Sequence, residues 1–344
     1  MDLSNTIASA VPREGMNDLY QQIYKYVYDI RMIEFEEYIY GMNRKKIDRE
    51  KAYKMIIEAP DSESNPLILF WKARLVDPDC IYRSSRVEKN ESRAIAFYRK
   101  AVDLDIERMV EADDQHAQAC LGEVYEFGRG VDKNKSTAVK WYRKAAEQGY
   151  AMAQNKLGLM FHFGRGVDQN YKTAVEWFRK AAEQGHAIAQ TMLGEMYENG
   201  WGVDENYSTA AEWYREAAEQ GDARAQFNLG LMYENGWGVY ENYSTAVEWY
   251  REAAGQDHAG AQFNLGMMYE NGRSVDQNYS TAVEWYREAA ELNHAGAQFK
   301  LGVMYKNGWG VVENYSTAVE WYREAAELGH TGAQFNLGVM YKNG

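Results

Sequence analysis

Four histidines recur at one fixed position along this chain, and histidine is the residue type here best suited to binding a metal ion. They are His186, His258, His294 and His330. Equivalent positions in neighbouring helical units lie about 10 Å apart because packed helices are spaced by that distance. Zinc needs its ligands at about 2 Å, so the row of histidines cannot form one site. We expect these side chains to cap helices or contact solvent, and we predict no metal site.

Two further segments begin like known binding loops and then depart from them. GRGVDKNKS at 128–136 lacks the glycine directly before Lys135 that a phosphate-binding loop requires, and it follows a predicted helix instead of a strand. Asp204, Asn206 and Ser208 are spaced as in a calcium loop, but Arg215 occupies the place of the bidentate glutamate. No Ser-x-x-Lys sequence occurs. We therefore predict no catalytic residues, no cofactor and no enzymatic activity.

A repeat of 36 residues organises the chain from residue 115 onward. Its most regular feature is a Leu-Gly pair, found at 121–122, 157–158, 193–194, 229–230, 265–266, 301–302 and 337–338. In the unit that begins at Ala223, a first helix is expected over 223–235, ending at Gly236, and Asn242 is expected to cap a second helix. A fixed period of this length is typical of a solenoid. We predict an all-α fold, a right-handed α-solenoid of stacked antiparallel helix pairs.

Two regions are expected along the chain. Residues 1–110 form an N-terminal helical region with two degenerate helix pairs, because Ala94, Phe97 and Tyr98 repeat the spacing of Ala138, Trp141 and Tyr142. Residues 111–344 form the repeat array, with six complete units and a truncated seventh.

Glycine inside the first helix of each unit points to close packing. A glycine such as Gly230 costs about 1 kcal/mol relative to alanine in mid-helix. Its return in every unit indicates that a large group approaches the helix there, and Trp249 is the expected neighbour. At the end of the unit, Asp257 and Asn293 replace a glycine and are expected to adopt the left-handed conformation.

The charge and composition narrow the classes of partner. A net charge of −13 disfavours nucleic acid, whose binding depends on basic side chains, and also disfavours anionic lipid. Two cysteines cannot form a disulfide framework, which fits a reducing compartment. Neither a secretory signal nor an apolar segment of about 18 residues is apparent. We expect a cytoplasmic protein with no membrane insertion.

The repeated pattern A-x-A-Q-x-x-L-G-x-M-Y-x-x-G-x-G-V, followed by N-Y-x-x-A-x-x-W-Y-R-x-A-A-E-x-G, resembles the Sel-one-like repeat family. These repeats are relatives of tetratricopeptide repeats with a slightly longer period. The resemblance covers residues 115–344, with Ser274 in place of the second turn glycine as one of few departures. It implies an α-solenoid that serves as a scaffold or adaptor for protein complexes.

Placing Leu229-Gly230 on the Leu-Gly pair of tetratricopeptide repeats implies which residues face a concave groove. They are Arg224, Phe227, Leu231, Glu234, Asn235, Phe263, Met267, Glu270, Asn271, Phe299, Val303, Lys306 and Asn307. Apolar side chains beside amides suit an extended peptide or a partner helix. Two alternatives remain open: the phenylalanines could pack between adjacent repeats, and a role at the helix end is favoured for the asparagines.

Two other functions fit the same sequence. A self-associating structural protein would use its last helix, where Phe335, Leu337, Val339, Met340 and Tyr341 lack a covering second helix. Alternatively, the array would be the regulatory or targeting arm of a larger signalling enzyme or complex. Neither alternative requires a catalytic residue in the chain itself.

Overall fold

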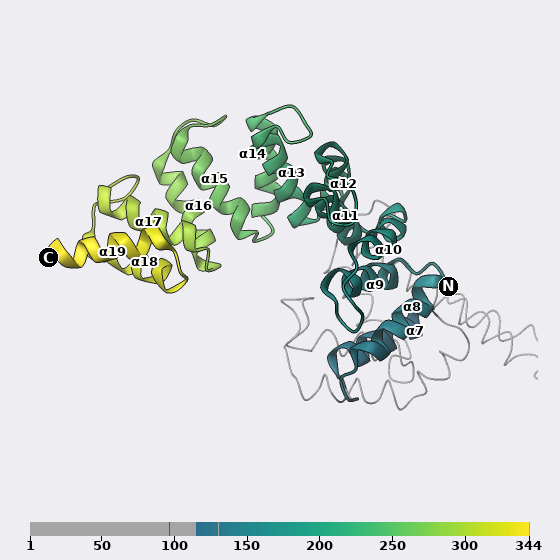
Figure 1. Ribbon diagram of the computed structural model, residues 1–344. Coiled ribbons are helices and arrows are strands. Elements are labelled where there is room, and N and C mark those ends of the chain that lie inside the picture. The colour runs from purple at the N-terminus through teal and green to yellow at the C-terminus, as the bar shows by residue number, and fades with distance from the viewer. Residues whose placement is uncertain (1–95, 97–114, 130, 344) are drawn as a thin grey trace, which may run out of the picture. The chain divides into compact units, whose positions relative to one another are not determined.

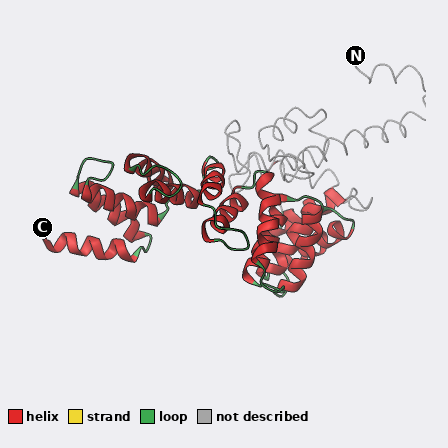
Figure 2. Cartoon of the chain, turned by 90° about the horizontal axis from the view of Figure 1, so that it is seen from above, coloured by secondary structure: helices red, strands yellow, loops and turns green. Residues whose placement is uncertain are grey.

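The computed structural model describes residues 96, 115–129 and 131–343, and within them it contains α-helices and no strand (Figures 1 and 2). The contacts divide the chain into two compact units, Met1–Ala145 and Ala146–Gly344. The degenerate helix pairs predicted before residue 110 lie outside the described residues apart from Ala96. The predicted domain boundary at 110 therefore stays a prediction.

Helices of nearly equal length follow one another in pairs (Figure 1). Their bounds are α7 (Gln115–Phe127), α8 (Lys135–Glu147), α9 (Ala151–Phe163), α10 (Tyr171–Glu183), α11 (Ala187–Asn199), α12 (Tyr207–Glu219), α13 (Ala223–Asn235), α14 (Tyr243–Ala254), α15 (Ala259–Asn271), α16 (Tyr279–Glu291), α17 (Ala295–Asn307), α18 (Tyr315–Glu327) and α19 (Thr331–Asn343). In the second unit, α9 packs on α10 and α11 on α12, and each second helix also packs on the first helix that follows. The fold class predicted from the sequence is confirmed.

The ends of the helices are set by the residues that the repeat places there. Gly236 follows α13 with φ 69°, and its N–H donates to the Met232 carbonyl. Asn242 directly precedes α14 as its N-cap, and its side-chain oxygen accepts a hydrogen bond of 3.1 Å from the Thr245 N–H. Both features satisfy backbone groups that have no partner within the helix. The predicted helix stop and N-cap of this unit are therefore confirmed.

Three residues other than glycine have a positive φ in the described part of the chain. Asp257 and Asn293 have φ values of 61° and 60°, as their position at the end of the repeat predicts. Ser274 has φ 52°, in the turn where the other repeats carry glycine. The turns keep their shape at these three positions because the backbone adopts the left-handed conformation there, although this conformation is less favourable for residues with a side chain than for glycine.

The glycine inside the first helix lies against a tyrosine in α7, α11, α13, α15 and α17, and against Phe178 in α9, which corrects one expectation from the sequence. A Cβ atom built on Gly230 would lie 2.5 Å from the Tyr250 ring, and the tyrosine is fully buried. Trp249, the expected neighbour, is only partly buried. The two residues are adjacent on α14, about 100° apart around the helix, so the close contact selects only one of them. Sequence alone does not show which of two neighbouring aromatic residues faces the glycine.

Candidate protein-interaction surface on the first helices

The three phenylalanines predicted to face the groove lie between neighbouring repeats. Phe227 stacks on His258 at 4.5 Å between ring centres, and Phe263 stacks on His294 at 4.6 Å. Phe299 stacks on His330 in the same way. All three rings are partly buried. One side of each ring thus packs against the next repeat, as the alternative interpretation expected, and the binding role of the exposed part stays a prediction.

Aliphatic side chains continue this surface one helical turn further on. Leu231, Met267 and Val303 are partly buried and pack against the core clusters of their repeats. Each is four residues after a phenylalanine, so both lie on the same face of the helix. Together these six residues make a partly exposed apolar row along α13, α15 and α17.

Glu234 and Glu270 accept hydrogen bonds from buried tyrosines. The Tyr250 hydroxyl donates to Glu234 at 2.6 Å, and the Tyr286 hydroxyl donates to Glu270. Burial and the carboxylate raise the pKa of both hydroxyls. Each carboxylate also has a cation from the following repeat, Arg273 at 3.7 Å from Glu234 and Lys300 at 3.1 Å from Glu270. These glutamates are therefore part of the packing between helices and repeats.

Lys306 replaces the glutamate in the next repeat, and the tyrosine there loses its acceptor. Tyr322 is fully buried, and its hydroxyl has no hydrogen-bond partner within the described residues. The nearby Asn336 side chain partly offsets the rise that burial causes in the Tyr322 pKa, but it does not reach good hydrogen-bond geometry. The change from glutamate to lysine at this position thus leaves a buried hydroxyl without an acceptor among the described residues.

The asparagines of the predicted groove are exposed and hydrogen-bonded to their own helices. Asn235 and Asn271 each donate to the carbonyl oxygen four residues earlier at 2.8 Å, and Asn307 does so at 2.9 Å. These bonds satisfy carbonyl groups at the ends of the helices. The geometry matches the helix-end role, and a contact with a ligand stays a prediction.

Arg224 lies at the edge of this surface, paired with a carboxylate that the sequence analysis did not single out. Its guanidinium is 2.5 Å from Glu195 on α11, and the Glu195 side chain is almost completely buried. Burial raises the Glu195 pKa to about 7, although Arg224 acts in the opposite direction. The sequence contains a signal for this pair, because Glu195 is a charged residue at the helix position that Leu231, Met267 and Val303 occupy in the later repeats.

The repeated histidines cap the first helices. The Nδ1 atoms of His186, His258 and His294 accept hydrogen bonds from backbone N–H groups three residues later, at 3.3, 3.2 and 3.1 Å. Burial lowers the pKa of all three, to about 4 for His186. The predicted capping role is confirmed.

The pKa of His186 predicts a stability that falls in mild acid. Its folded pKa of about 4 lies below the unfolded value of about 6.5, so the unfolded chain alone takes up a proton between these values. We expect a loss of about 2 kcal/mol from this group between pH 7 and pH 5. Thermal unfolding of the wild type and of His186→Asn measures this loss. Relative to the variant, the wild type should lose free energy of unfolding as the pH falls from 7 to 5. If the difference in free energy of unfolding between the two proteins does not depend on pH, the lowered pKa of His186 is contradicted. The raised pKa of Glu195 changes stability in the opposite direction, but it does so equally in both proteins and cancels in the comparison.

No group of three or more histidine, cysteine, aspartate or glutamate side chains within the described residues could hold a metal ion. No helix in that part of the chain is long and apolar enough to cross a membrane.

Comparison with known proteins identifies the family. The Sel1 repeat model matches residues 79–106, 115–150, 151–186, 187–222, 223–258, 259–294, 295–330 and 331–344. The chain belongs to the Sel1 repeat family. No curated protein matches it.

Two solved Sel1-type structures are similar to this chain over most of its length. One is a protective antigen present in uropathogenic Escherichia coli strains that displays an SLR fold. It is 32% identical with a TM-score of 0.64, over 95% of this chain and 67% of that chain. The other is a Sel1 repeat protein from Oxalobacter formigenes, 37% identical with a TM-score of 0.62, over 67% of this chain and 92% of that chain.

Proposed function

We propose that this chain is a non-catalytic scaffold or adaptor that binds a peptide or a segment of a partner protein on its first helices. Sel1 repeat proteins generally act as scaffolds for protein interaction, which supports the class of function. The observation that carries the proposal is the partly exposed apolar row of Phe227, Leu231, Phe263, Met267, Phe299 and Val303. Rings and aliphatic chains held in place by packing offer contact area at little entropic cost.

The charges beside the row would orient the bound segment. Glu234 and Glu270 lie on α13 and α15, the first two helices of the row, and Lys306 lies on α17, the last. A segment with apolar anchors, a basic end over α13 to α15 and an acidic end over α17 would match this order. The proposed compartment is the cytoplasm, because the two cysteines form no disulfide framework.

The proposal is tested with peptides selected from a displayed random library against the wild-type chain. Introducing charge into the row with Met267→Glu and Val303→Glu should weaken binding of the selected peptides at least tenfold. The control is Ser244→Glu with Ser316→Glu, which adds the same charge at exposed positions near the starts of α14 and α18. Circular dichroism checks that both proteins keep their helices. Equal affinity for the wild type and the Met267/Val303 variant would place binding elsewhere.

Self-association through α19 is the second candidate function. Phe335 is 71% exposed, and a Cβ atom on Gly338 would meet nothing within 4 Å, unlike the glycines that tyrosines cover. A second copy could cover this face. Size-exclusion chromatography with light scattering decides: the wild type should form a dimer that Phe335→Glu abolishes. A wild type that stays monomeric at high concentration would contradict self-association.

A further inference from the structure

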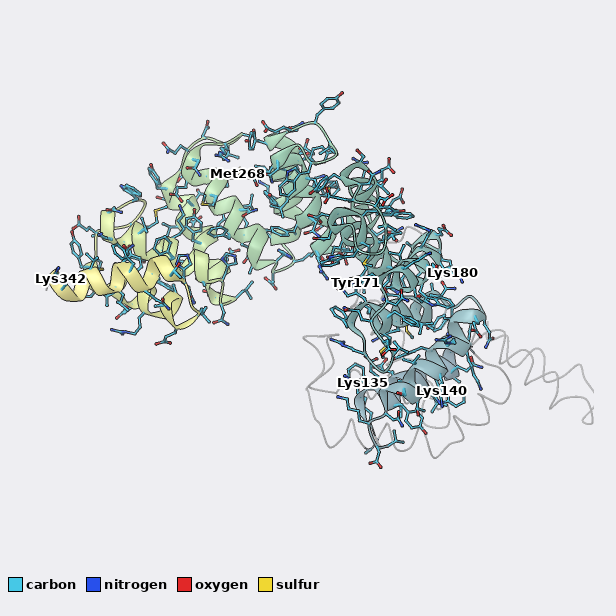
Figure 3. The ribbon with its side chains drawn as sticks, in the orientation of Figure 1. Lys135, Lys140, Tyr171, Lys180, Met268 and Lys342 are labelled. Carbon is cyan, nitrogen blue, oxygen red and sulfur yellow. The ribbon has the colours of Figure 1, made fainter. Side chains whose placement is uncertain are left out.

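Two lysines on the second helices lie over tryptophan rings. The Lys144 ammonium is 4.4 Å from the centre of the Trp141 ring on α8, and the Lys180 ammonium is 4.2 Å from that of Trp177 on α10 (Lys180 is labelled in Figure 3). The spacing of three residues places both side chains on one face of the helix. A cation over an aromatic face is attracted by the ring's quadrupole. In these two repeats the chain supplies that cation itself.

The next four repeats keep the tryptophan and replace the lysine with glutamate. The resulting Trp–Glu row consists of Trp213 with Glu216, Trp249 with Glu252, Trp285 with Glu288, and Trp321 with Glu324. The four tryptophans are partly buried and the four glutamates are exposed. Among the residues that the structure describes, no lysine or arginine lies over these four rings. Each repeat therefore presents an aromatic surface with a carboxylate at the place where a cation lies in α8 and α10.

Three of the four arginines closest in sequence to the row donate hydrogen bonds away from it. Arg215, Arg251 and Arg287 each donate a hydrogen bond to a tyrosine hydroxyl of the following repeat, at 3.3, 2.9 and 2.6 Å. Over residues 187–330 the chain has 22 acidic and 8 basic side chains. Burial, together with Asp257, Glu291 and Glu284, raises the pKa of the Glu288 carboxyl. The surroundings of the row are thus strongly negative.

Two buried glutamines beside the row, Gln262 and Gln298, have side-chain oxygens with no hydrogen-bond partner within the described residues. Gln184, Gln220 and Gln256 donate to the amide oxygens of Gln154, Gln190 and Gln226, at 2.7, 2.6 and 2.8 Å. Leu292 and Leu328 take the place of these donors in the following repeats and are exposed. Within the part of the chain that the structure describes, the oxygens of Gln262 and Gln298, both 98% buried, accept no hydrogen bond, while their nitrogens lie 3.5 and 3.4 Å from Glu288 and Glu324. Unpaired amide oxygens therefore lie close to these two carboxylates, and both are acceptors that a cationic donor could reach.

We propose that the Trp–Glu row is a second interaction surface, which binds a basic segment of a partner protein through lysine or arginine side chains. Each cation would lie over one tryptophan and against one glutamate, as Lys144 and Lys180 lie over their tryptophans in this chain. Neighbouring sites are separated by the width of one repeat, about 10 Å. An extended segment with a basic residue at every third position has this spacing, because a strand rises about 3.3 Å per residue. The surface lies on second helices and is independent of the row on the first helices.

The test uses a fluorescent peptide with four lysines, one at every third position of a Gly/Ser sequence, in about 0.15 M salt, where long-range attraction is screened. The triple variant Glu252→Lys, Glu288→Lys and Glu324→Lys gives these rings the cation found in α8 and α10. We expect it to bind the peptide at least tenfold more weakly than the wild type by fluorescence anisotropy. A peptide with serine at the four lysine positions should not bind.

The matched control is Glu248→Lys, Glu284→Lys and Glu320→Lys. It changes the net charge by the same amount on the same helices, and lysine occurs naturally at the equivalent Lys140 (labelled in Figure 3). We expect the control to lose less than threefold in affinity. Equal losses in the two triple variants would show general attraction to an acidic surface and overturn the proposal. A wild type that does not bind the lysine peptide would overturn it as well.

Discussion

Replacing Gly266 with alanine is expected to destabilise the array by about 3 kcal/mol, the upper end of typical overpacking costs. Alanine is the better helix former by about 1 kcal/mol, so propensity alone predicts the opposite sign. The new Cβ would overlap the Tyr286 ring, closer than real contacts allow. Tyr286 is fully buried and cannot move aside without shifting α16. Leucine at the same position should cost more than alanine.

Gly338 provides the matched control for this substitution. It occupies the same position in α19 as Gly266 does in α15, but a Cβ atom there would meet nothing within 4 Å. Gly338→Ala should therefore be neutral or stabilising, by up to about 1 kcal/mol. Guanidinium and thermal unfolding, followed by circular dichroism, measure both variants. A Gly266→Ala protein as stable as the wild type would show that the glycine is not required by packing.

Much of the fold could be predicted from the sequence because its determinants are local. The period, the helix end at Gly236 and the cap at Asn242 depend on residues within one repeat. The partner of Gly230 could not be predicted in the same way. Trp249 and Tyr250 are both large and aromatic, and only the rotation of α14 about its axis decides between them. That rotation is set by packing against the neighbouring repeats, which no single repeat encodes.

The candidate site also combines features that the sequence predicts with features that only the packing between repeats determines. The sequence placed Phe263 and Met267 on one face of a helix, and both are partly exposed there. It did not reveal that His294, which caps the first helix of the next repeat, covers one side of the Phe263 ring. The pairing of Arg224 with Glu195 joins two repeats. Contacts between repeats depend on the geometry of stacking, whereas the face of a helix depends only on its period.

One pair of positions varies together along the array, and the structure gives the reason. Where the first helix ends with a glutamate, as at Glu126, Glu198, Glu234 and Glu270, the second helix carries a tyrosine that donates to it. Where His162 stands in place of the glutamate, Phe178 stands in place of the tyrosine. The hydroxyl is thus present where an acceptor exists and absent where it does not. Lys306 with Tyr322 is the exception among the described repeats.

This exception predicts opposite results for one chemical change made at two equivalent positions. Tyr250→Phe removes a hydrogen bond to Glu234 and should cost about 1.5 kcal/mol, because bonds to charged groups contribute more than neutral ones. Tyr322→Phe removes a buried hydroxyl without a partner and should change stability by less than about 0.5 kcal/mol, or increase it. Thermal unfolding measures both, with a drop of about 3–6 °C expected for Tyr250→Phe alone.

Restoring the acceptor should make the two positions behave alike. Lys306→Glu places a carboxylate where Glu234 and Glu270 lie in the preceding repeats, within reach of the Tyr322 hydroxyl. In that background Tyr322→Phe should cost about as much as Tyr250→Phe does in the wild type, because the hydroxyl then has a charged acceptor. If Tyr322→Phe is equally mild with lysine or glutamate at 306, the hydrogen bond is not what links these positions. If Tyr322→Phe is already costly with lysine at position 306, the Tyr322 hydroxyl makes a stabilising contact in the wild type, and the prediction is wrong.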